Sequence, residues 1–189
     1  GTGFLPDIFH CNDWQTCLTP LLLALAEDNS PLAASRSVFT VHNMAYQGVF
    51  WHLDLHLTNL GWEVFHPEIL EFYGKINLLK AGMVGADAIN TVSKKYAQEI
   101  QTPEYGCGLE GVLQNRGADV SGILNGADYD HWSPEKDKFI ARRYSPEDLA
   151  GKKECRRDLL KHFHIPEEGK RPVFGIISRL VDQKGFDLI

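Results

Sequence analysis

The feature that most constrains the fold of this chain is an alternation of short apolar runs with helical patterns. Apolar runs at residues 6–10, 37–43, 87–93 and 120–124 have the length and composition of strands. The segments between several of these runs follow helical spacing. Strands that alternate with helices predict a parallel sheet covered by helices, so we expect an α/β fold.

The helical patterns themselves give specific expectations. Residues 13–27 predict a helix with Asp13 as its N-cap, and residues 94–101 predict a second helix. Another helical face is predicted from spacings of four, three and four residues between Phe72, Ile76, Leu79 and Met83. Near the end of the chain we expect a helix at 153–163 and then a strand at 171–178, with three side chains of that helix facing inward: Leu159, Leu160 and Phe163.

The charge distribution predicts a domain boundary. Residues 1–133 contain six Lys and Arg against 15 Asp and Glu, whereas residues 134–171 contain 11 against eight. The change coincides with a run of Asn, Gly, Asp and Pro at 125–137, which is typical of turns and linkers. We therefore expect residues 1–127 and 146–189 to belong to different domains, joined by a linker at 128–145.

Composition excludes several classes of protein. A net charge of −6 argues against a nucleic-acid binder, and no run reaches the roughly 20 apolar residues of a membrane span. The four cysteines form no C-x-x-C pair, which favours reduced thiols in a cytoplasmic protein. The sequence starts and stops inside expected secondary structure, which predicts an internal fragment.

Polar residues follow the apolar runs at the points where ligands bind to open α/β sheets, beyond the carboxyl ends of the strands. Such residues are His10 to Asp13, His42 and Asn43, Asn125 and Gly126, and Ser178 and Arg179. Arg179 and Lys184 could together bind a diphosphate beside a helix N-terminus, although both could equally be solvated loop residues.

The other candidates also have two interpretations. His42, near Gly48, could bond a sugar hydroxyl or support a developing positive charge, or it could be a loop histidine bonded to backbone. Asp13 could line a site while capping a helix, and Asn125 could simply belong to a turn. Asp128 and Asp130 form a D-x-D pattern, but in a linker it gives little support to a metal site.

Five motifs in order give the chain a recognisable family character: HCNDWQTCLTPLLLAL, VFTVHNMAYQGVF, INLLKAGMVGADAINTVSKKYAQEIQTPEYGCGLEGVL, GILNGADYDHWSPEKD and ISRLVDQKGFDLI. Together they resemble the bacterial glycogen synthase and plant starch synthase family, the retaining glycosyltransferases of family 5. The resemblance implies a GT-B fold with two Rossmann-like parallel-sheet domains, both incomplete here. Residues 1–127 would be the latter part of the acceptor-side domain, and 146–189 the start of the nucleotide-sugar domain.

The resemblance also implies an activity and its residues. Family members transfer glucose from ADP-glucose to the non-reducing end of an α-1,4-glucan, without a metal or other cofactor, in the cytoplasm or, in plants, in the plastid. Arg179 and Lys184 match the residues that bind the donor diphosphate, and His42 matches a histidine near the transferred glucose. Asp13 and Asn125 match residues that line the cleft. Contacts from Asn12 are not carried over, because the family commonly has a different residue there.

Two other functions remain open. A GT-B enzyme that uses a UDP-sugar, such as a sucrose synthase-like protein, would bind diphosphate equally well, although the YQG and GLEGVL runs favour glucan synthases. A non-catalytic glucan-binding protein could stack sugars on its aromatic residues, although burial is the commoner role of such residues: Trp14, Tyr46, Trp51 and Trp62. Since the family's lysine-glycine-glycine loop and glutamate motif are missing, we expect this chain alone to be inactive.

Overall fold

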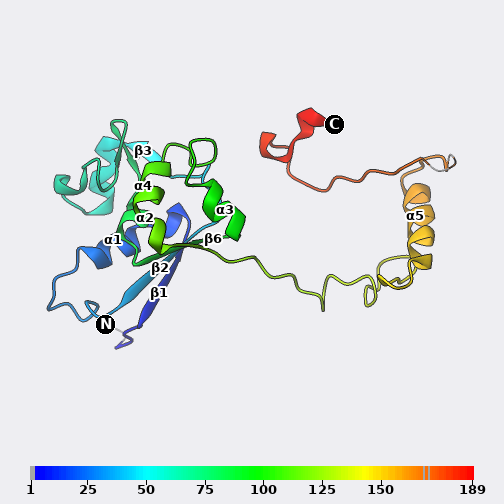
Figure 1. Ribbon diagram of the computed structural model, residues 1–189, viewed down its shortest axis with the longest axis horizontal. Helices are drawn as coiled ribbons and strands as arrows, with labels where there is room; N and C mark the ends of the chain where they lie inside the picture. Colours follow the sequence, from blue (N-terminus) through cyan, green and yellow to red (C-terminus); the bar gives the residue numbers. More distant parts are fainter. Residues whose placement is uncertain (1–2, 168, 170) are drawn as a thin grey trace. The chain divides into compact units, whose positions relative to one another are not determined.

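The computed structural model describes residues 3–167, 169 and 171–189. The chain divides into two compact units, Gly1–Gly126 and Ala127–Ile189 (Figure 1). None of the helices among the described residues has the length and apolar character needed to cross a membrane.

The first unit contains a parallel sheet of four strands. In chain order these are β1 (Ile8–Asn12), β2 (Arg36–Val41), β6 (Ala88–Thr91) and β7 (Val120–Gly122), and they lie in the order β1-β2-β6-β7. All three pairings are parallel. Its helices are α1 (Leu18–Ala24), α2 (Leu78–Gly85), α3 (Lys94–Glu99) and α4 (Glu110–Asn115) (Figure 1). The expected α/β architecture and its four strands are therefore confirmed.

The central strands form the core because their side chains are covered on both faces of the sheet. Phe39 and Val41 of β2 and Ile89 of β6 are fully buried, and they pack with Leu79 and Met83 of α2. Burial of each such side chain contributes about 1.5–3 kcal/mol to stability. The register pairs Asn12 with Thr40, which brings the carboxyl ends of β1 and β2 to the same level.

A small antiparallel sheet accounts for one wrong prediction. It consists of β3 (Val49–Trp51), β4 (Glu71–Phe72) and β5 (Lys75–Asn77), in the order β3-β5-β4. The helical face predicted from Phe72 to Met83 is interrupted because Tyr73 and Gly74 form a tight turn with φ of 50° and 77°. Positive φ at both central residues is typical of the type I′ turn of a two-residue hairpin. The helix therefore begins only at Leu78.

The small sheet and its connections have a core of their own. The 3₁₀ helices His52–Thr58 and Trp62–Val64 follow β3, and shorter 3₁₀ turns occur at Trp14–Thr16 and Gly117–Asp119. Leu55, Val64, Leu70 and Ile76 pack together against Ala81 of α2. Helix α2 thus contributes to both cores of the first unit, with different side chains facing each of them.

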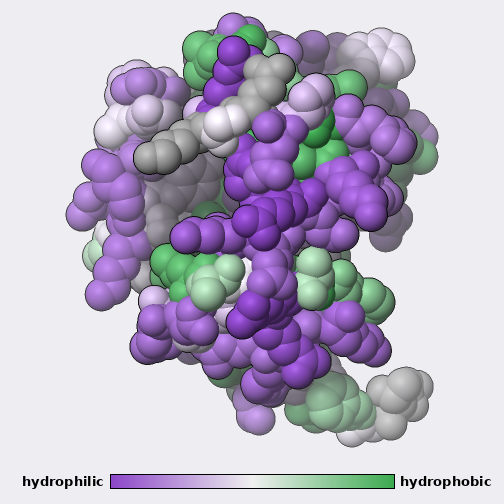
Figure 2. All heavy atoms as spheres, turned by 90° about the vertical axis from the view of Figure 1, so that its right-hand side faces the viewer, coloured by the Kyte–Doolittle hydropathy of each residue, from purple (hydrophilic) through white to green (hydrophobic). Residues whose placement is uncertain are grey.

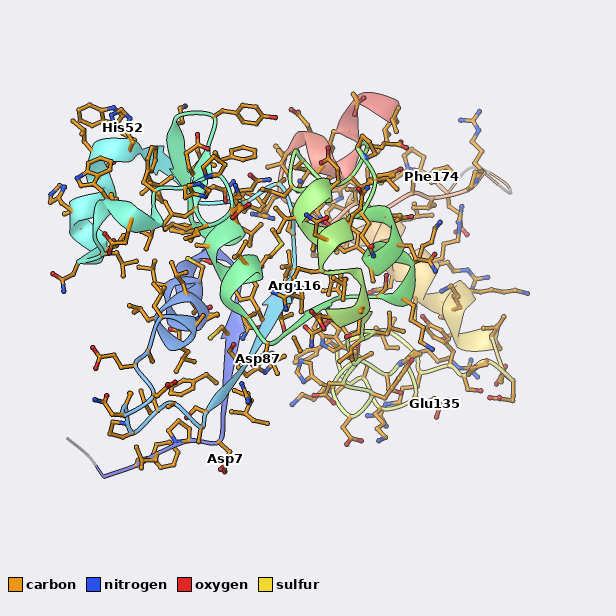
Figure 3. The ribbon with its side chains drawn as sticks, turned by 60° about the vertical axis from the view of Figure 1, so that its left-hand side comes forward. Asp7, His52, Asp87, Arg116, Glu135 and Phe174 are labelled. Carbon is orange, nitrogen blue, oxygen red and sulfur yellow. The ribbon has the colours of Figure 1, made fainter. Side chains whose placement is uncertain are left out.

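The C-terminal end of α2 is held by hydrogen bonds from a single arginine. At its C-terminal end, Arg116 donates to the carbonyls of Met83, Val84 and Ala86 at 2.6–3.0 Å. A cation is favoured there because the last carbonyls of a helix lack partners and carry partial negative charge. Figure 3 labels Arg116 together with Asp87, which lies between α2 and the start of β6.

Asp87 links the starts of β2 and β6. Its carboxylate accepts from the Ser37 amide at 2.7 Å and from Arg36 Nη1 at 3.1 Å. Burial disfavours the charged carboxylate, but the hydrogen bonds from Ser37 and the Arg36 guanidinium outweigh this effect and lower the pKa of Asp87 below 3.8. A lowered pKa means that the native state binds this proton more weakly than the unfolded state does.

We expect the Asp87→Asn variant to lose about 1 kcal/mol of unfolding free energy at pH 7, since its pairing is partly exposed. The contribution of Asp87 is full above pH 3.8 and is lost as the pH falls through the lower folded-state pKa. Urea unfolding at pH 7 and pH 3 checks this, with the exposed Asp28→Asn as control. An equal difference between Asp87→Asn and the wild type at both pH values would contradict the prediction.

The second unit is built around helix α5 (Ala150–His162), with 3₁₀ turns at Asp182–Lys184 and Phe186–Leu188. The predicted helix at 153–163 is confirmed, but only Leu160 of its expected inward side chains is buried. Leu159 and Phe163 are 43% and 62% exposed, so their predicted burial is wrong for this structure. The face of the molecule shown in Figure 2 is mainly hydrophilic, with separate apolar patches.

The strand predicted at 171–178 is not formed. These residues have no regular structure, and Phe174 and Ile177 are exposed. A strand is stable only when a neighbour pairs with its backbone, and the described part of the second unit contains no other strand. The apolar pattern alone therefore did not determine its conformation.

Candidate functional site

Three polar residues meet at the carboxyl ends of β1 and β2. Asp13 Oδ1 accepts a hydrogen bond from the backbone amide of His42 at 2.8 Å. The ring of His42 contacts the side chain of Asn12, with 3.0 Å between Nε2 and Oδ1. His42 is exposed, so its ring is held by neighbours yet remains accessible. This arrangement could orient an imidazole toward a ligand.

Asp13 does not act as the predicted helix cap. Its side chain makes no capping hydrogen bond to the following turn and instead contacts His42, 29 residues away in sequence. Its backbone has φ of 54° and ψ of −178°, a conformation that normally requires glycine and costs about 1–3 kcal/mol. Hydrogen bonds from Asp13 N to Thr40 O and from Thr16 N to Asp13 O hold it there. Strain of this kind concentrates at functional sites.

A second group of polar side chains lies on the strands that precede Asp13 and His42 and on the neighbouring β6. Thr40 Oγ1 is 2.7 Å from His10 Nε2 and donates to Asn90 Oδ1 at 2.5 Å. These residues come from β1, β2 and β6, so the hydrogen bonds tie three neighbouring strands together close to their carboxyl ends. This group supports the backbone from which Asp13 and His42 extend.

The loop after His42 is packed tightly against the rest of the unit. Met44 is buried, and its amide donates to the hydroxyl of Tyr96 at 3.2 Å. Gly48 has φ of 61°, and a Cβ added there would lie 2.6 Å from the indole of Trp14. Glycine is therefore required both for the backbone conformation and for the close approach of the indole. The loop has little freedom to move His42.

The remaining predicted residue of this unit lies farther along the same edge. Asn125 follows β7, which is separated from β2 by β6, and its side chain is exposed. Among the described residues, no hydrogen bond joins its side chain to His42 or Asp13. It shares the edge of the sheet with them but not their cluster.

Arg179 and Lys184 lie in one short segment of the second unit. Lys184 N donates to Val181 O at 2.9 Å and Val181 N to Arg179 O at 3.0 Å, so the segment is compact. Both side chains are exposed, and within the described part of the chain no carboxylate lies within ion-pair distance of either. The helix expected beside these two cations is a single 3₁₀ turn, Phe186–Leu188.

The carboxylates of the D-x-D pattern are engaged locally. Asp128 Oδ1 accepts the amides of Asp130 and His131, and Asp130 Oδ1 accepts Lys136 Nζ at 2.5 Å. Among the residues the structure describes, no cluster of three or more His, Cys, Asp or Glu has the geometry of a metal site.

Two of the four cysteines lie close to β1 and α1 but are not available for chemistry. Cys11 and Cys17 are buried in the core, and burial raises the pKa of the Cys17 thiol to about 12. Burial raises the pKa of Cys11 as well. Both are therefore protonated and unreactive near neutral pH.

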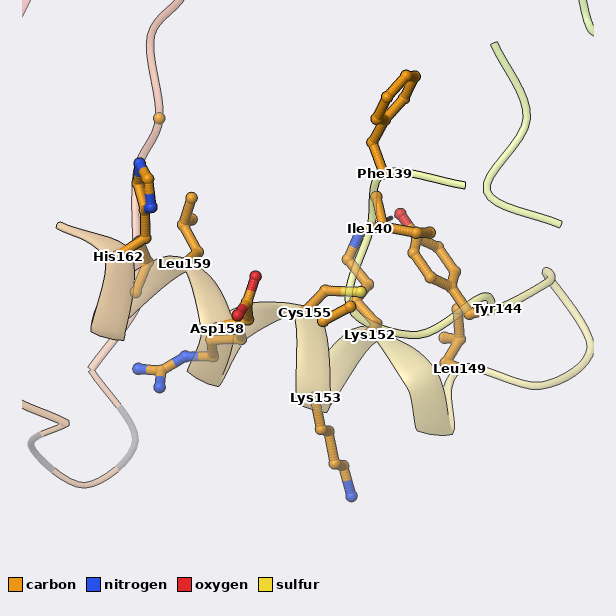
Figure 4. A pocket seen from close by; sticks show the side chains of 14 residues that line it. Phe139, Ile140, Tyr144, Leu149, Lys152, Lys153, Cys155, Asp158, Leu159 and His162 are labelled. Atoms are coloured by element: carbon orange, nitrogen blue, oxygen red, sulfur yellow. Dashed lines mark hydrogen bonds between the residues drawn. The ribbon is translucent and has the colours of Figure 1, made fainter. Parts of the chain in front are cut away.

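A groove of about 760 Å³ in the second unit contains none of the predicted site residues. It lies beside α5 and is lined by Phe139, Tyr144, Leu149 and Leu159 (Figure 4). Its lining combines exposed apolar side chains with charged ones of α5, among them Lys152, Arg156 and Asp158.

The sequence pattern places Asn12 among the polar residues that follow the first strand, but nothing in it indicates that Thr40 belongs to the site. The family resemblance carries no contact over to Asn12, and Thr40 lies inside a predicted strand. The register between β1 and β2 could have indicated both, because it places Asn12 opposite Thr40 directly before the polar ends of the strands.

Comparison with known proteins adds independent information. A family described as the starch synthase catalytic domain matches residues 1–115. The glycogen synthase of Koribacter versatilis is 53% identical over 186 residues, which cover 98% of this chain and 38% of that protein. The glycogen synthase of Myxococcus xanthus is 50% identical over 187 residues, covering 98% of this chain and 39% of that protein.

A solved structure resembles the whole fold. The catalytic domain of starch synthase IV from Arabidopsis thaliana, bound to ADP and acarbose, has a TM-score of 0.87 and 35% identity. The match covers 99% of this chain and 39% of that one, and it confirms the GT-B fold class expected from the sequence. This chain thus spans about two fifths of the length of the relatives that it matches.

Proposed function

The chain belongs to the starch synthase catalytic domain family, and on that basis we propose that it forms part of a retaining glucosyltransferase. The reaction is transfer of glucose from ADP-glucose to the non-reducing end of an α-1,4-glucan. The observation that carries the proposal is the cluster of Asn12, Asp13 and His42 at the carboxyl ends of β1 and β2, on a chain whose relatives are glycogen synthases.

Each candidate residue has a role in this proposal. Arg179 and Lys184 bind the diphosphate and stabilise the negative charge that grows on it as the bond to glucose breaks. His42 faces the transferred glucose, with its backbone held by Asp13. Asn125 contributes a polar contact at the same edge of the sheet.

The proposed chemistry needs no group other than donor and acceptor. The bond between glucose C1 and the phosphate oxygen breaks, and C1 bonds to the acceptor hydroxyl oxygen on the same face. The hydroxyl proton passes to the departing phosphate oxygen. Since the transition state has oxocarbenium-like charge, polar groups around the sugar assist without a protein nucleophile.

Because the chain spans about two fifths of its relatives, it supplies only part of this site in our proposal. We expect residues 1–189 alone to show no turnover of ADP-glucose. Residues 1–127 would contribute to the acceptor side and 146–189 to the donor side. A cytoplasmic location likewise remains a prediction.

The experiment is a donor competition with the complete natural polypeptide that carries this sequence. Labelled ADP-glucose and UDP-glucose are offered together with a maltooligosaccharide, and the label in elongated glucan is measured. We expect incorporation mainly from ADP-glucose. Preference for UDP-glucose would support the UDP-sugar alternative, and no incorporation from either donor would contradict glucosyl transfer.

One observation favours glucan binding as a second candidate function. Tyr46, Trp51 and Trp62 are about half exposed, so they are not the buried aromatic residues that are commonest. Exposed rings of this kind can stack on sugars. A protein that only binds glucan would retain maltooligosaccharide affinity while transferring no glucose.

A further inference from the structure

Two buried amide side chains, Gln47 and Asn77, lie next to the loop that carries His42. Gln47 is 9% exposed and Asn77 is fully buried. Asn77 Nδ2 donates to Gln47 Oε1 at 2.7 Å. Neither has a part in the transfer proposed above, yet burial of two amides is costly unless their hydrogen bonds are satisfied.

Gln47 uses both protons of its amide to join two loops. Its Nε2 donates to the carbonyl of Met44 at 3.1 Å, within the loop 42–48, and to the carbonyl of Cys107 at 3.0 Å. Cys107 lies 60 residues farther along the chain and has φ of 53°. One side chain therefore holds the loop after β2 against the loop that precedes α4.

Asn77 connects the same loop to the start of α2. Its Oδ1 caps the helix by accepting the Lys80 amide at 3.0 Å. The first two amides of the helix donate to the carbonyls of Gly48 and Gln47 at 3.1 and 2.9 Å. The amides at the start of α2, which have no partner within a helix, are thus bonded to the loop and its amide pair.

The orientation of both amides is determined by their partners. If the Gln47 amide were rotated, its oxygen would face two carbonyls and its NH₂ would face the NH₂ of Asn77. If the Asn77 amide were rotated, the Lys80 amide would lose its acceptor. A single arrangement satisfies all four hydrogen bonds, so the pair specifies one relative position of the loops.

We propose that Gln47 and Asn77 are positioning residues for glucosyl transfer. Their buried amide pair holds the loop 42–48, which carries His42 and is called the His42 loop below, against α2 and against the loop with Cys107 that precedes α4. The proposal rests on the proposed function, and neither residue touches the substrate. Small displacements of a group beside the reacting atoms cost large factors in rate, so loosening the loop lowers the rate of transfer.

Gln47→Glu keeps the size of the side chain but removes the two donors that face the Met44 and Cys107 carbonyls. In the complete natural polypeptide, we expect kcat to fall about tenfold to hundredfold. The KM for the donor changes less than about threefold, because in our proposal Arg179 and Lys184 bind its diphosphate. Burial at this position raises the pKa of the new carboxyl. Since a protonated carboxyl can donate one hydrogen bond, the activity relative to wild type rises as the pH is lowered from 8 to 6.

Gln114→Glu is the matched control. Gln114 Nε2 donates to a single carbonyl, that of Gln101, at an exposed position on α4. It makes the same chemical change without touching the His42 loop, so we expect wild-type kcat. A second variant, Asn77→Ser, keeps an oxygen that can cap α2 but cannot reach Gln47 as Asn77 does, and it serves if Gln47→Glu fails to fold.

Hydrogen exchange gives a readout that does not depend on activity. In Gln47→Glu and Asn77→Ser we expect faster exchange in residues 42–48 and faster thiol labelling of Cys107, with exchange in β2 unchanged. Wild-type kcat, or a loss of kcat without faster exchange at 42–48, would overturn the proposal, and so would equally faster exchange throughout the unit. If the wild type transfers no glucose, the proposed function fails, and the loop-holding role is decided by exchange alone.

Discussion

Lys184→Ala in the complete natural polypeptide is expected to lower kcat for transfer from ADP-glucose by about 10²–10³. Removal of one group that stabilises charge only in the transition state has effects of this size. The Lys184 side chain is exposed in a compact turn and is not used by an ion pair within the described residues, so it is available to a diphosphate. Steady-state kinetics with saturating glucan measure the change.

The control for this prediction is Lys153→Ala. Lys153 is an exposed lysine of α5 in the same unit, so it changes the net charge equally. Its kcat is expected to stay within about twofold of the wild type. If Lys184→Ala also remained within that range, the diphosphate role would be wrong. Loss of transfer by Lys184→Ala with unchanged glucan affinity separates an enzyme from a protein that only binds glucan.

His42→Ala is expected to lower kcat by about 10²–10³ as well, because it removes the side chain that faces the transferred glucose in our proposal. Adding Asp13→Ala to His42→Ala should cost little more, since Asp13 acts by holding the His42 backbone at 2.8 Å. Residues that work as one unit show such non-additivity. The four proteins of this cycle are compared by kcat.

His56→Ala is the matched control for the histidine. Its ring is bonded to the carbonyl of Leu53 in the 3₁₀ helix His52–Thr58, away from β1 and β2. It should keep wild-type kcat. Fully additive losses in the His42 and Asp13 cycle would show that Asp13 acts on its own and not through His42.

The parallel sheet could be predicted because its strands are buried and continuous in the sequence. Val38 to Val41 and Ala88 to Thr91 are short runs rich in apolar and β-branched residues, a composition that favours a buried strand over a helix. His42 and Asp13 meet at the carboxyl ends of two strands of this sheet, β1 and β2. The rule that ligands bind beyond the carboxyl ends of parallel strands therefore predicts the position of this cluster from the sequence.

Other features depended on information that local patterns lack. The turn at Tyr73 and Gly74 places Phe72 and Ile76 in strands, although their spacing suits a helix. Residues 171–178 have a strand-like composition but no neighbouring strand among the described residues of their unit. In both cases the tertiary partner, and not the local sequence, determined the conformation.

The side-chain contacts of the site could not be predicted from the sequence either. Asp13 precedes a helical run, which predicts an N-cap. In the structure its carboxylate instead accepts the backbone amide of His42. Gln47 and Asn77 are 30 residues apart, and only the fold shows that they form a pair. Side-chain direction and long-range hydrogen bonds decide such roles.

We propose, above all, that Arg179 and Lys184 bind the diphosphate of the donor and that His42 faces its glucose. A crystal structure of the complete natural polypeptide with ADP and a maltooligosaccharide tests it most directly. We predict the diphosphate within hydrogen-bond distance of Arg179 and Lys184, and the His42 ring beside the sugar position next to it. ADP bound without either cation, or His42 lying away from that ligand, would contradict the account.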